Sequence, residues 1–321
     1  MGVWKRVRNI KRYYVDSAWQ TILPQYEDEI SVIKIIEFDN KIYGGTYPNA
    51  NLLEWSGGAE WVLKADQFSS QTSMRIIEFD SKIYGGTYPN GLLLEWNSTG
   101  EIWAMAAGQL DSQLIRSLVV HDGDLYAGTY PDGMLFKFTS GSTEWVMVAD
   151  NHTTAANVVW LNTLVSYNSK VYGGAFGGDG GVKLLEFNST GAEWLVVADT
   201  NNSDWCTSLA AFDGSLFAGT YPDGTLLEWD GSTTWTQKAG ALLDGYHSIG
   251  VLIDFDSNLY GFTGYNDTQG AKLLKWNGID TWVQAADQVN AQRYGNDLVD
   301  FNGVLYGCTS DNGQLLKFVD R

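Results

Sequence analysis

The segments Ile42-Tyr43-Gly44-Gly45-Thr46-Tyr47-Pro48 and Ile83-Tyr84-Gly85-Gly86-Thr87-Tyr88-Pro89 are identical, and they decide the fold. Five looser copies follow along the chain. One aromatic residue anchors each copy, and successive anchors lie 41, 42, 46, 45, 43 and 46 residues apart: Tyr43, Tyr84, Tyr126, Tyr172, Phe217, Tyr260 and Tyr306. A nearly constant period of this length is the signature of a repeat architecture.

Each repeat contains four short runs with β-strand character. In the second repeat the expected strands are residues 75–79, 83–87, 92–96 and 101–106. Turn sequences such as Asp80-Ser81 and Pro89-Asn90-Gly91 separate the runs. A content of 14% aromatic residues and 36 Gly suits many short strands joined by tight turns. The sequence therefore predicts an all-β, seven-bladed β-propeller of four-stranded blades.

The ring is expected to close through the N-terminal segment. A Trp recurs in the fourth strand of six repeats, at Trp61, Trp103, Trp145, Trp194, Trp235 and Trp282, and is missing after the seventh anchor. Trp19 lies 24 residues before Tyr43, and the other distances from this Trp to the next anchor are 23 to 27 residues. Residues near 19–23 should therefore supply the outer strand of the last blade. This divides the chain into a basic arm, residues 1–18, and the propeller, residues 19–321.

Small residues follow each anchor aromatic, as in Gly44-Gly45, and they would weaken a strand unless something needed the space. We expect a neighbouring blade to pack closely there. The predicted fillers are the large aromatics of the third strands: Trp55, Trp96, Phe138, Phe187, Trp229, Trp276 and Phe318.

Three resemblances accompany this pattern. The run KIYGGTYPNGLLLEWNSTGEIWAMAA from Lys82 resembles a kelch repeat, although the spacing from Tyr to the Gly pair is shorter. The hairpin WDGSTTW from Trp229 resembles the Asp-box of sialidase-type propellers without its Asp at the usual place. The lead-in VWKRVRNIKRYYVDSAWQTI from Val3 to Ile22 is similar to segments of bacteriophage tail and tail-fibre proteins. These likenesses imply a propeller, and the last implies a virion component.

The charge distribution restricts the partners. The net charge is −18, and Lys5, Arg6, Arg8, Lys11 and Arg12 place +5 in the first twelve residues, which leaves −23 for the rest. Such a body should repel nucleic acid and anionic membranes. No apolar run reaches the roughly 20 residues of a membrane span, and no signal peptide is recognisable, so we expect synthesis in the cytoplasm. The arm is expected to dock on a virion neighbour.

Residues that the repeat does not explain are the candidates for a binding site. Trp160 and Trp205 are assigned to blade-to-blade connections, on the same face as the loops between second and third strands. Aromatic rings beside polar groups suit either a glycan or a protein surface, and the sequence leaves both open. The predicted ligand-binding residues are Trp160, Trp205, Tyr246, Tyr294, Tyr26, Arg75, Arg116 and Arg293.

Catalytic groups are few. The three His residues fall in different repeats and on opposite faces, so a Ser-His-Asp or metal cluster is not expected. The Asp-rich loops are interpreted as turns rather than calcium sites, and neither a cofactor nor a Cys206–Cys308 disulfide is expected. The sequence predicts a non-catalytic binding or assembly propeller, in a virion. The alternatives are a cytoplasmic kelch-like scaffold and, more remotely, a sialidase-like hydrolase.

Overall fold

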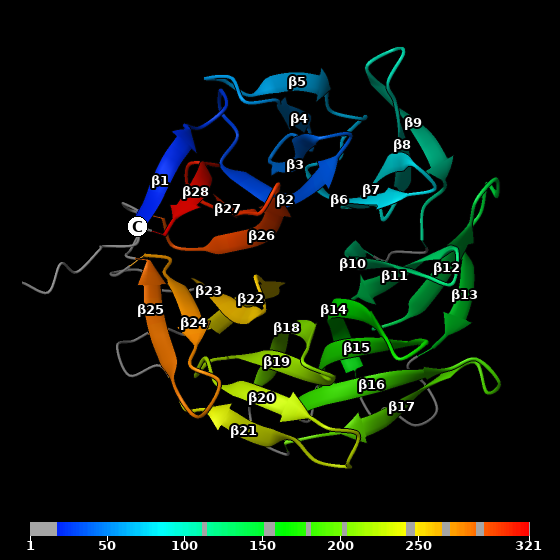
Figure 1. The fold of residues 1–321 in the computed structure, drawn as a ribbon. Helices are drawn as coiled ribbons and strands as arrows, with labels where there is room; N and C mark the ends of the chain where they lie inside the picture. The colour runs from blue at the N-terminus through cyan, green and yellow to red at the C-terminus, as the bar shows by residue number, and fades with distance from the viewer. Residues whose placement is uncertain are drawn as a thin grey trace, which may run out of the picture.

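A computed structural model describes residues 18–110, 114–150, 158–177, 181–200, 204–241, 248–264, 270–286 and 292–320. These residues form seven four-stranded antiparallel sheets around a central axis (Figure 1). The predicted seven-bladed β-propeller is confirmed. Within the described residues, no helix is long and apolar enough to span a membrane.

The four strands of each blade follow one another from the axis to the rim. Blade 1 consists of β2 (Ser31–Phe38), β3 (Lys41–Tyr47), β4 (Leu52–Trp55) and β5 (Val62–Ala65). Blade 2 consists of β6 (Ser73–Phe79), β7 (Lys82–Tyr88), β8 (Leu93–Asn97) and β9 (Ile102–Ala107). Blade 3 consists of β10 (Leu114–His121), β11 (Asp124–Tyr130), β12 (Leu135–Thr139) and β13 (Val146–Ala149). Blades 4 and 5 consist of β14 (Val158–Tyr167), β15 (Lys170–Gly177), β16 (Val182–Asn188) and β17 (Glu193–Ala198); and β18 (Trp205–Phe212), β19 (Ser215–Tyr221), β20 (Leu226–Trp229) and β21 (Thr236–Ala239). Blades 6 and 7 consist of β22 (Ser248–Phe255), β23 (Asn258–Gly264), β24 (Leu273–Trp276) and β25 (Trp282–Ala286); and β26 (Gly295–Phe301), β27 (Val304–Thr309), β28 (Leu315–Val319) and β1 (Ala18–Leu23).

The two faces of the ring differ. The loop face carries the connections between blades and the loops between second and third strands, and the turn face carries the hairpin turns. Asn51, in the loop after β3, donates from Nδ2 to Glu29 Oε1 at 2.7 Å, which joins that loop to the connection before β2. In six blades a buried Thr is the last or next-to-last residue of the second strand, and its hydroxyl accepts a backbone N–H across the loop at 2.8 to 3.2 Å: Thr46, Thr87, Thr129, Thr220, Thr263 and Thr309.

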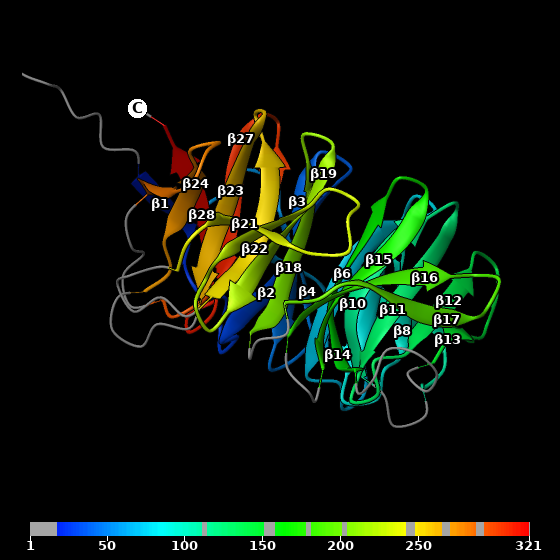
Figure 2. The same ribbon diagram turned by 90° about the horizontal axis from the view of Figure 1, so that it is seen from below.

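The ring closes at both edges of blade 7, as the position of Trp19 predicted at the outer edge. Strand β1 pairs antiparallel with β28, with Trp19 opposite Phe318 (Figure 2). The indole ring lies 5.9 Å from the Phe318 ring and 5.3 Å from the Phe262 ring of blade 6. At the inner edge, buried Asp297 of β26 accepts from Lys34 Nζ at 2.9 Å and from Ile35 N at 3.0 Å, both in blade 1. First and last blades are therefore held together near the axis and at the rim.

The third-strand aromatics do not fill the space above the glycines, so that prediction is wrong. Each instead packs on the anchor aromatic of the preceding blade at 5.3 to 6.2 Å between ring centroids, as Trp96 does on Tyr43. The first glycine faces the fourth-strand Trp of its own blade: a Cβ on Gly44 would lie 3.5 Å from Trp61. The second glycine faces the next blade, since a Cβ on Gly45 would lie 2.6 Å from the backbone oxygen of Met74.

Blade 6 reverses the size pattern of this second contact. Phe262 occupies the position that Gly45 has in blade 1, and Gly295 occupies the position that Met74 has in blade 2. A Cβ on Gly295 would collide with the Phe262 ring. The large and small partners have thus exchanged strands, which keeps the two blades in close contact.

Buried Tyr–Glu pairs predict sensitivity to alkali. The hydroxyls of Tyr43, Tyr84 and Tyr172 donate to third-strand glutamates at 2.7 to 2.9 Å. Burial, and then the bonded carboxylate, raises the pKa of each phenol well above its ordinary value of 10.0. Because the unfolded phenols release protons first, stability should be complete below pH 10 and fall as the pH rises further. Urea midpoints measured from pH 8 to 11 should show this fall, and it should be smaller in a variant with Phe at all three positions.

Candidate functional site

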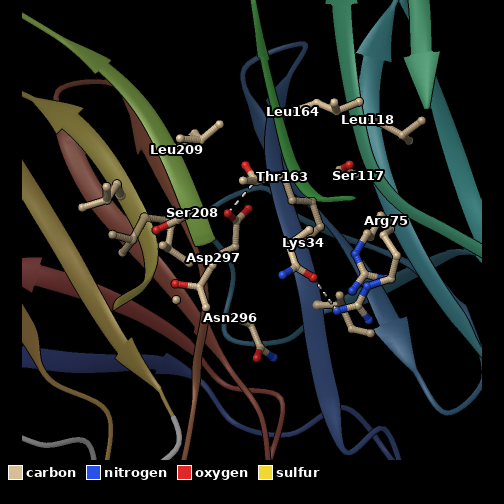
Figure 3. Close-up of a pocket in the computed structure, with 18 of the residues that line it drawn as sticks. Lys34, Arg75, Ser117, Leu118, Thr163, Leu164, Ser208, Leu209, Asn296 and Asp297 are labelled. Atoms are coloured by element: carbon tan, nitrogen blue, oxygen red, sulfur yellow. Dashed lines mark hydrogen bonds and ion pairs between the residues drawn. The ribbon is translucent and has the colours of Figure 1, made fainter. Parts of the chain in front are cut away.

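The inner strands of all seven blades line a central cavity of about 650 Å³. Its two ends differ in polarity. Lys34, Arg75 and Asn296 project into the cavity toward the loop face, whereas leucines such as Leu164 and Leu209 lie farther along the axis (Figure 3). The cavity therefore offers polar groups near the loop face above an apolar floor, where electrostatic interactions are stronger than in water.

β-Bulges help to set which side chains reach the axis. Six inner strands carry one extra residue at the same level, and four of these extra residues line the cavity with polar side chains: Arg116, Asn162, Thr207 and Asn296. Strand β6 of blade 2 has no register shift there, and Arg75 pairs directly with Gly86. A bulge re-aims a side chain without ending the strand. Arg75 and Arg116 thus reach the cavity from adjacent blades by different local backbones.

Trp160 and Trp205 lie in inner strands rather than in connections, which corrects the sequence assignment. Trp160 is in β14 opposite Phe176, and Trp205 begins β18 opposite Tyr221. The two indoles meet edge to face at 5.2 Å, and Phe176 and Tyr221 lie 4.5 and 4.9 Å from Trp205. Tyr130 completes this aromatic wall at 5.2 Å from Trp160. Trp160, Trp205 and Tyr221 line the cavity.

Two arginines line the same cavity as this wall. The Arg116 guanidinium lies 5.6 Å from the centre of the Trp160 ring and donates to Asn162 Oδ1 at 3.4 Å, while its buried Nε has no hydrogen-bond partner. Among the described residues, no hydrogen bond or ion pair holds Arg75. Burial, and then the charge of Arg116, lowers the pKa of Arg75 to about 9, and burial lowers the pKa of Arg116. Both remain cationic at neutral pH.

The other charges of the cavity neutralise each other. Lys34 and Asp297 form the 2.9 Å ion pair that closes the ring. Burial raises the pKa of Asp297, and Lys34 opposes that shift. Since Lys34, Arg75, Arg116 and Asp297 are the charged residues that line the cavity, its unbalanced charge is that of the two arginines.

The remaining predicted site residues lie elsewhere. Arg293 is 52% exposed and forms an ion pair with Asp311 through Nη2 at 2.7 Å, with its own backbone N–H on the same carboxylate. Tyr294 lies beside it, with the Arg293 guanidinium 5.9 Å from its ring. Tyr26 packs against the core between blades 7 and 1. Tyr246 lies outside the described residues. The structure thus brings together Trp160, Trp205, Arg75 and Arg116, whereas Tyr26, Arg293 and Tyr294 are not part of the cavity lining.

Several lining residues were not predicted from the sequence, including Lys34, Asn162, Tyr221, Asn296 and Asp297. Asn162 and Asn296 share the bulge position with Arg116, so aligning the inner strands at their bulges would have grouped them. Tyr221 occupies a position near the end of the second strand where a Tyr recurs in several blades. The blade 1 residue at this position, Tyr47, is 41% exposed. Tyr221 is part of the cavity wall because it packs on the neighbouring Trp205.

The turn face holds a Ser-His-Asp arrangement that the sequence did not predict. His121 Nδ1 lies 2.9 Å from Ser166 Oγ, and His121 Nε2 lies 3.4 Å from Asp122 Oδ2. Asp122 is 78% exposed and binds the nitrogen opposite to the one that orients a catalytic histidine in the usual triad. The group lies outside the cavity. It has the geometry of a surface hydrogen-bond chain.

In the described part of the chain, no group of three or more His, Cys, Asp or Glu side chains could hold a metal ion. Cys206 and Cys308 are free and buried, and burial raises the pKa of both thiols. Neither is a reactive thiolate at neutral pH.

No family model and no curated protein match this chain. Solved structures do match. The extracellular domain of BT4673 from B. thetaiotaomicron, described as a hybrid two component system, aligns with a TM-score of 0.68 and 13% identity over 95% of this chain and 40% of its own. This chain thus spans less than half of that domain. YCF48 from Cyanidioschyzon merolae aligns with a TM-score of 0.66 and 13% identity over 94% of this chain and 98% of its own. A structure of YCF48 bound to D1 peptide aligns with a TM-score of 0.67 and 16% identity over 94% of this chain and 97% of its own. At these identities the likeness establishes a shared propeller fold.

Proposed function

We propose that this chain is a non-catalytic binding propeller and that its ligand is a carbohydrate, bound at the loop-face end of the central cavity. The observation that carries the proposal is the pair Trp160 and Trp205, whose rings form a wall of the cavity and belong to none of the buried core clusters. An indole face packs well on the C–H face of a sugar. The Nδ2 groups of Asn162 and Asn296 donate to backbone oxygens of the next blade, which fixes both side chains and leaves their Oδ1 atoms to accept from sugar hydroxyls. An axial cavity of about 650 Å³ suits one or two sugar units better than a broad protein surface.

Replacing Trp160 or Trp205 by Leu should abolish most carbohydrate binding while the protein stays folded. Leu retains apolar volume and removes the flat ring. Each indole makes three ring contacts worth about 0.5–1.5 kcal/mol apiece, so each variant should lose roughly 2–4 kcal/mol in the free energy of unfolding, less than the typical total for a folded protein. A glycan array with the purified protein, read together with a melting curve, measures both effects. Unfolding of both variants at ordinary temperature would instead make these rings part of the core.

Tyr47→Ala is the matched control, because Tyr47 is an exposed aromatic on the same face that does not line the cavity. It should bind the array as the unsubstituted chain does. If Tyr47→Ala lost as much carbohydrate binding as the Trp160 and Trp205 variants, the binding site would lie in the surrounding loops rather than in the cavity.

A peptide ligand is the second candidate. The structurally similar YCF48 has been solved bound to D1 peptide, which supports peptide binding by this fold. Under that alternative the kelch-like resemblance would describe a cytoplasmic interaction scaffold. A protein bound through the loops around the cavity would be lost with Tyr47→Ala, whereas a sugar within the cavity would not.

The virion assignment extends the first proposal and rests on the resemblance of residues 3–22 to bacteriophage tail segments. Only the end of that segment, within β1, lies in the described residues, and residues 1–17 of the arm that would dock on a virion neighbour lie outside them. Detection of the protein in purified particles supports this assignment, and its confinement to the soluble cytoplasm contradicts it.

A further inference from the structure

The inner-strand position of Arg75 has a structural task in other blades. The equivalent residues of blades 3, 5 and 7 are Ser117, Ser208 and Asp297. Ser117 Oγ donates to Leu161 O at 3.1 Å, Ser208 Oγ donates to Ile249 O at 2.9 Å, and Asp297 accepts from blade 1. Each of these side chains therefore ties its blade to the next one.

Arg75 makes no such link within the described residues, although its guanidinium carries several N–H donors. Arg116 lines the same cavity, repels Arg75 and has a buried Nε without a partner. Keeping two cations together on an apolar floor costs free energy unless an anion lies between them. Ring closure and blade packing do not explain this pair.

The surroundings restrict the anion. The whole chain carries −18, so a polyanion such as nucleic acid is repelled before it reaches the cavity. A ligand with one negative group escapes most of that repulsion and meets two guanidiniums at the axis. A carboxylate matches the planar N–H fork of an arginine, and the aromatic wall beside Arg116 can hold the apolar face of the same ligand.

We infer that the ligand is an acidic sugar, with its carboxylate held between Arg75 and Arg116 and its ring against Trp160 and Trp205. This inference rests on the proposed carbohydrate-binding function and specifies its substrate class. Asn162, which accepts from Arg116 Nη2 at 3.4 Å, exchanges this long bond for a sugar hydroxyl when the carboxylate takes the guanidinium.

The test uses an array of glycan pairs that differ only in a carboxylate at the place of a hydroxymethyl group, followed by calorimetry on the best pair. The acidic member should bind at least tenfold more tightly than the neutral one. Arg75→Gln and Arg116→Gln should each remove this preference, and Arg75→Lys should retain part of it because the charge remains while the fork is lost. Arg293→Gln is the matched control and should change nothing, since Asp311 already occupies that guanidinium.

The outcomes separate the two claims. Equal binding of acidic and neutral glycans that depends on Trp160 overturns this inference and leaves the carbohydrate function standing. Preference for sulfated or phosphorylated glycans over carboxylated ones overturns the assignment of the acidic group as a carboxylate. Binding of a peptide with one acidic residue, in the absence of any glycan signal, overturns the carbohydrate function and this inference with it, as does the absence of any ligand. Melting curves of the Gln variants show whether they are folded.

Discussion

Deletion of residues 1–23 is expected to lower the free energy of unfolding by about 5 kcal/mol or more. The deletion removes β1, which supplies the outer strand of blade 7. Fully buried Leu23 and the Trp19 ring each contribute roughly 2–3 kcal/mol through burial. Strand β28 would in addition gain an open edge, which favours aggregation. Against a typical total of about 5–15 kcal/mol, this loss is enough to unfold much of the population.

Chemical denaturation of the purified chains measures this loss. Deletion of residues 1–16 is the control, because β1 remains, and its midpoint should match that of the full chain. Trp19→Ala should cost about 3–4 kcal/mol, whereas Trp19→Phe should cost less, since the indole N–H has no partner to lose. A shortened chain without β1 that keeps the full midpoint would show that the strand adds nothing to the closure of the ring.

The contact between blades 6 and 7 is expected to show strong coupling between its two residues. Phe262→Gly empties the space of a fully buried ring and should cost about 3–5 kcal/mol. Gly295→Ile drives a side chain into that ring and should cost at least as much, because the collision is with a buried group that cannot turn away. The double variant restores the arrangement of the other blades, a glycine facing a large aliphatic residue, and should be clearly more stable than either single variant.

Urea unfolding of the four proteins gives the coupling energy as a double-mutant cycle. We expect at least about 2 kcal/mol of recovery in the double variant. Additive losses would mean that the two residues do not share one space. Gly58→Ala serves as a control for adding a methyl group, because nothing lies within 4 Å of its Cβ position, and it should be neutral.

The fold was predictable because its determinants are local and repeated. The anchors and the fourth-strand Trp appear at one period, so the sequence shows both the number of blades and the missing strand that Trp19 completes. The partner of each glycine was not predictable in the same way. A Gly indicates that space is needed, but the residue that fills it lies in another strand, and Gly295 and Phe262 become recognisable as partners only when the blades are side by side.

The candidate site was predictable in composition and not in placement. Trp160 and Trp205 stand out because the repeat does not require them. Their position in connections is wrong because the inner strands β14 and β18 begin earlier than the repeat indicates and each carries a β-bulge, which leaves no periodic mark in the sequence. Arg75 and Arg293 look equivalent in sequence. The structure separates them, because the Asp311 carboxylate binds Arg293 whereas no carboxylate binds Arg75 in the described residues.

The closing strand also determines how the propeller can be tethered. Ala18 pairs with Val319, so both ends of the described ring leave blade 7 next to each other, at its turn face (Figure 2). Trp160 and Trp205 open toward the opposite side. A neighbour attached through either end would therefore contact the turn face of blade 7, on the side of the ring opposite the polar end of the cavity.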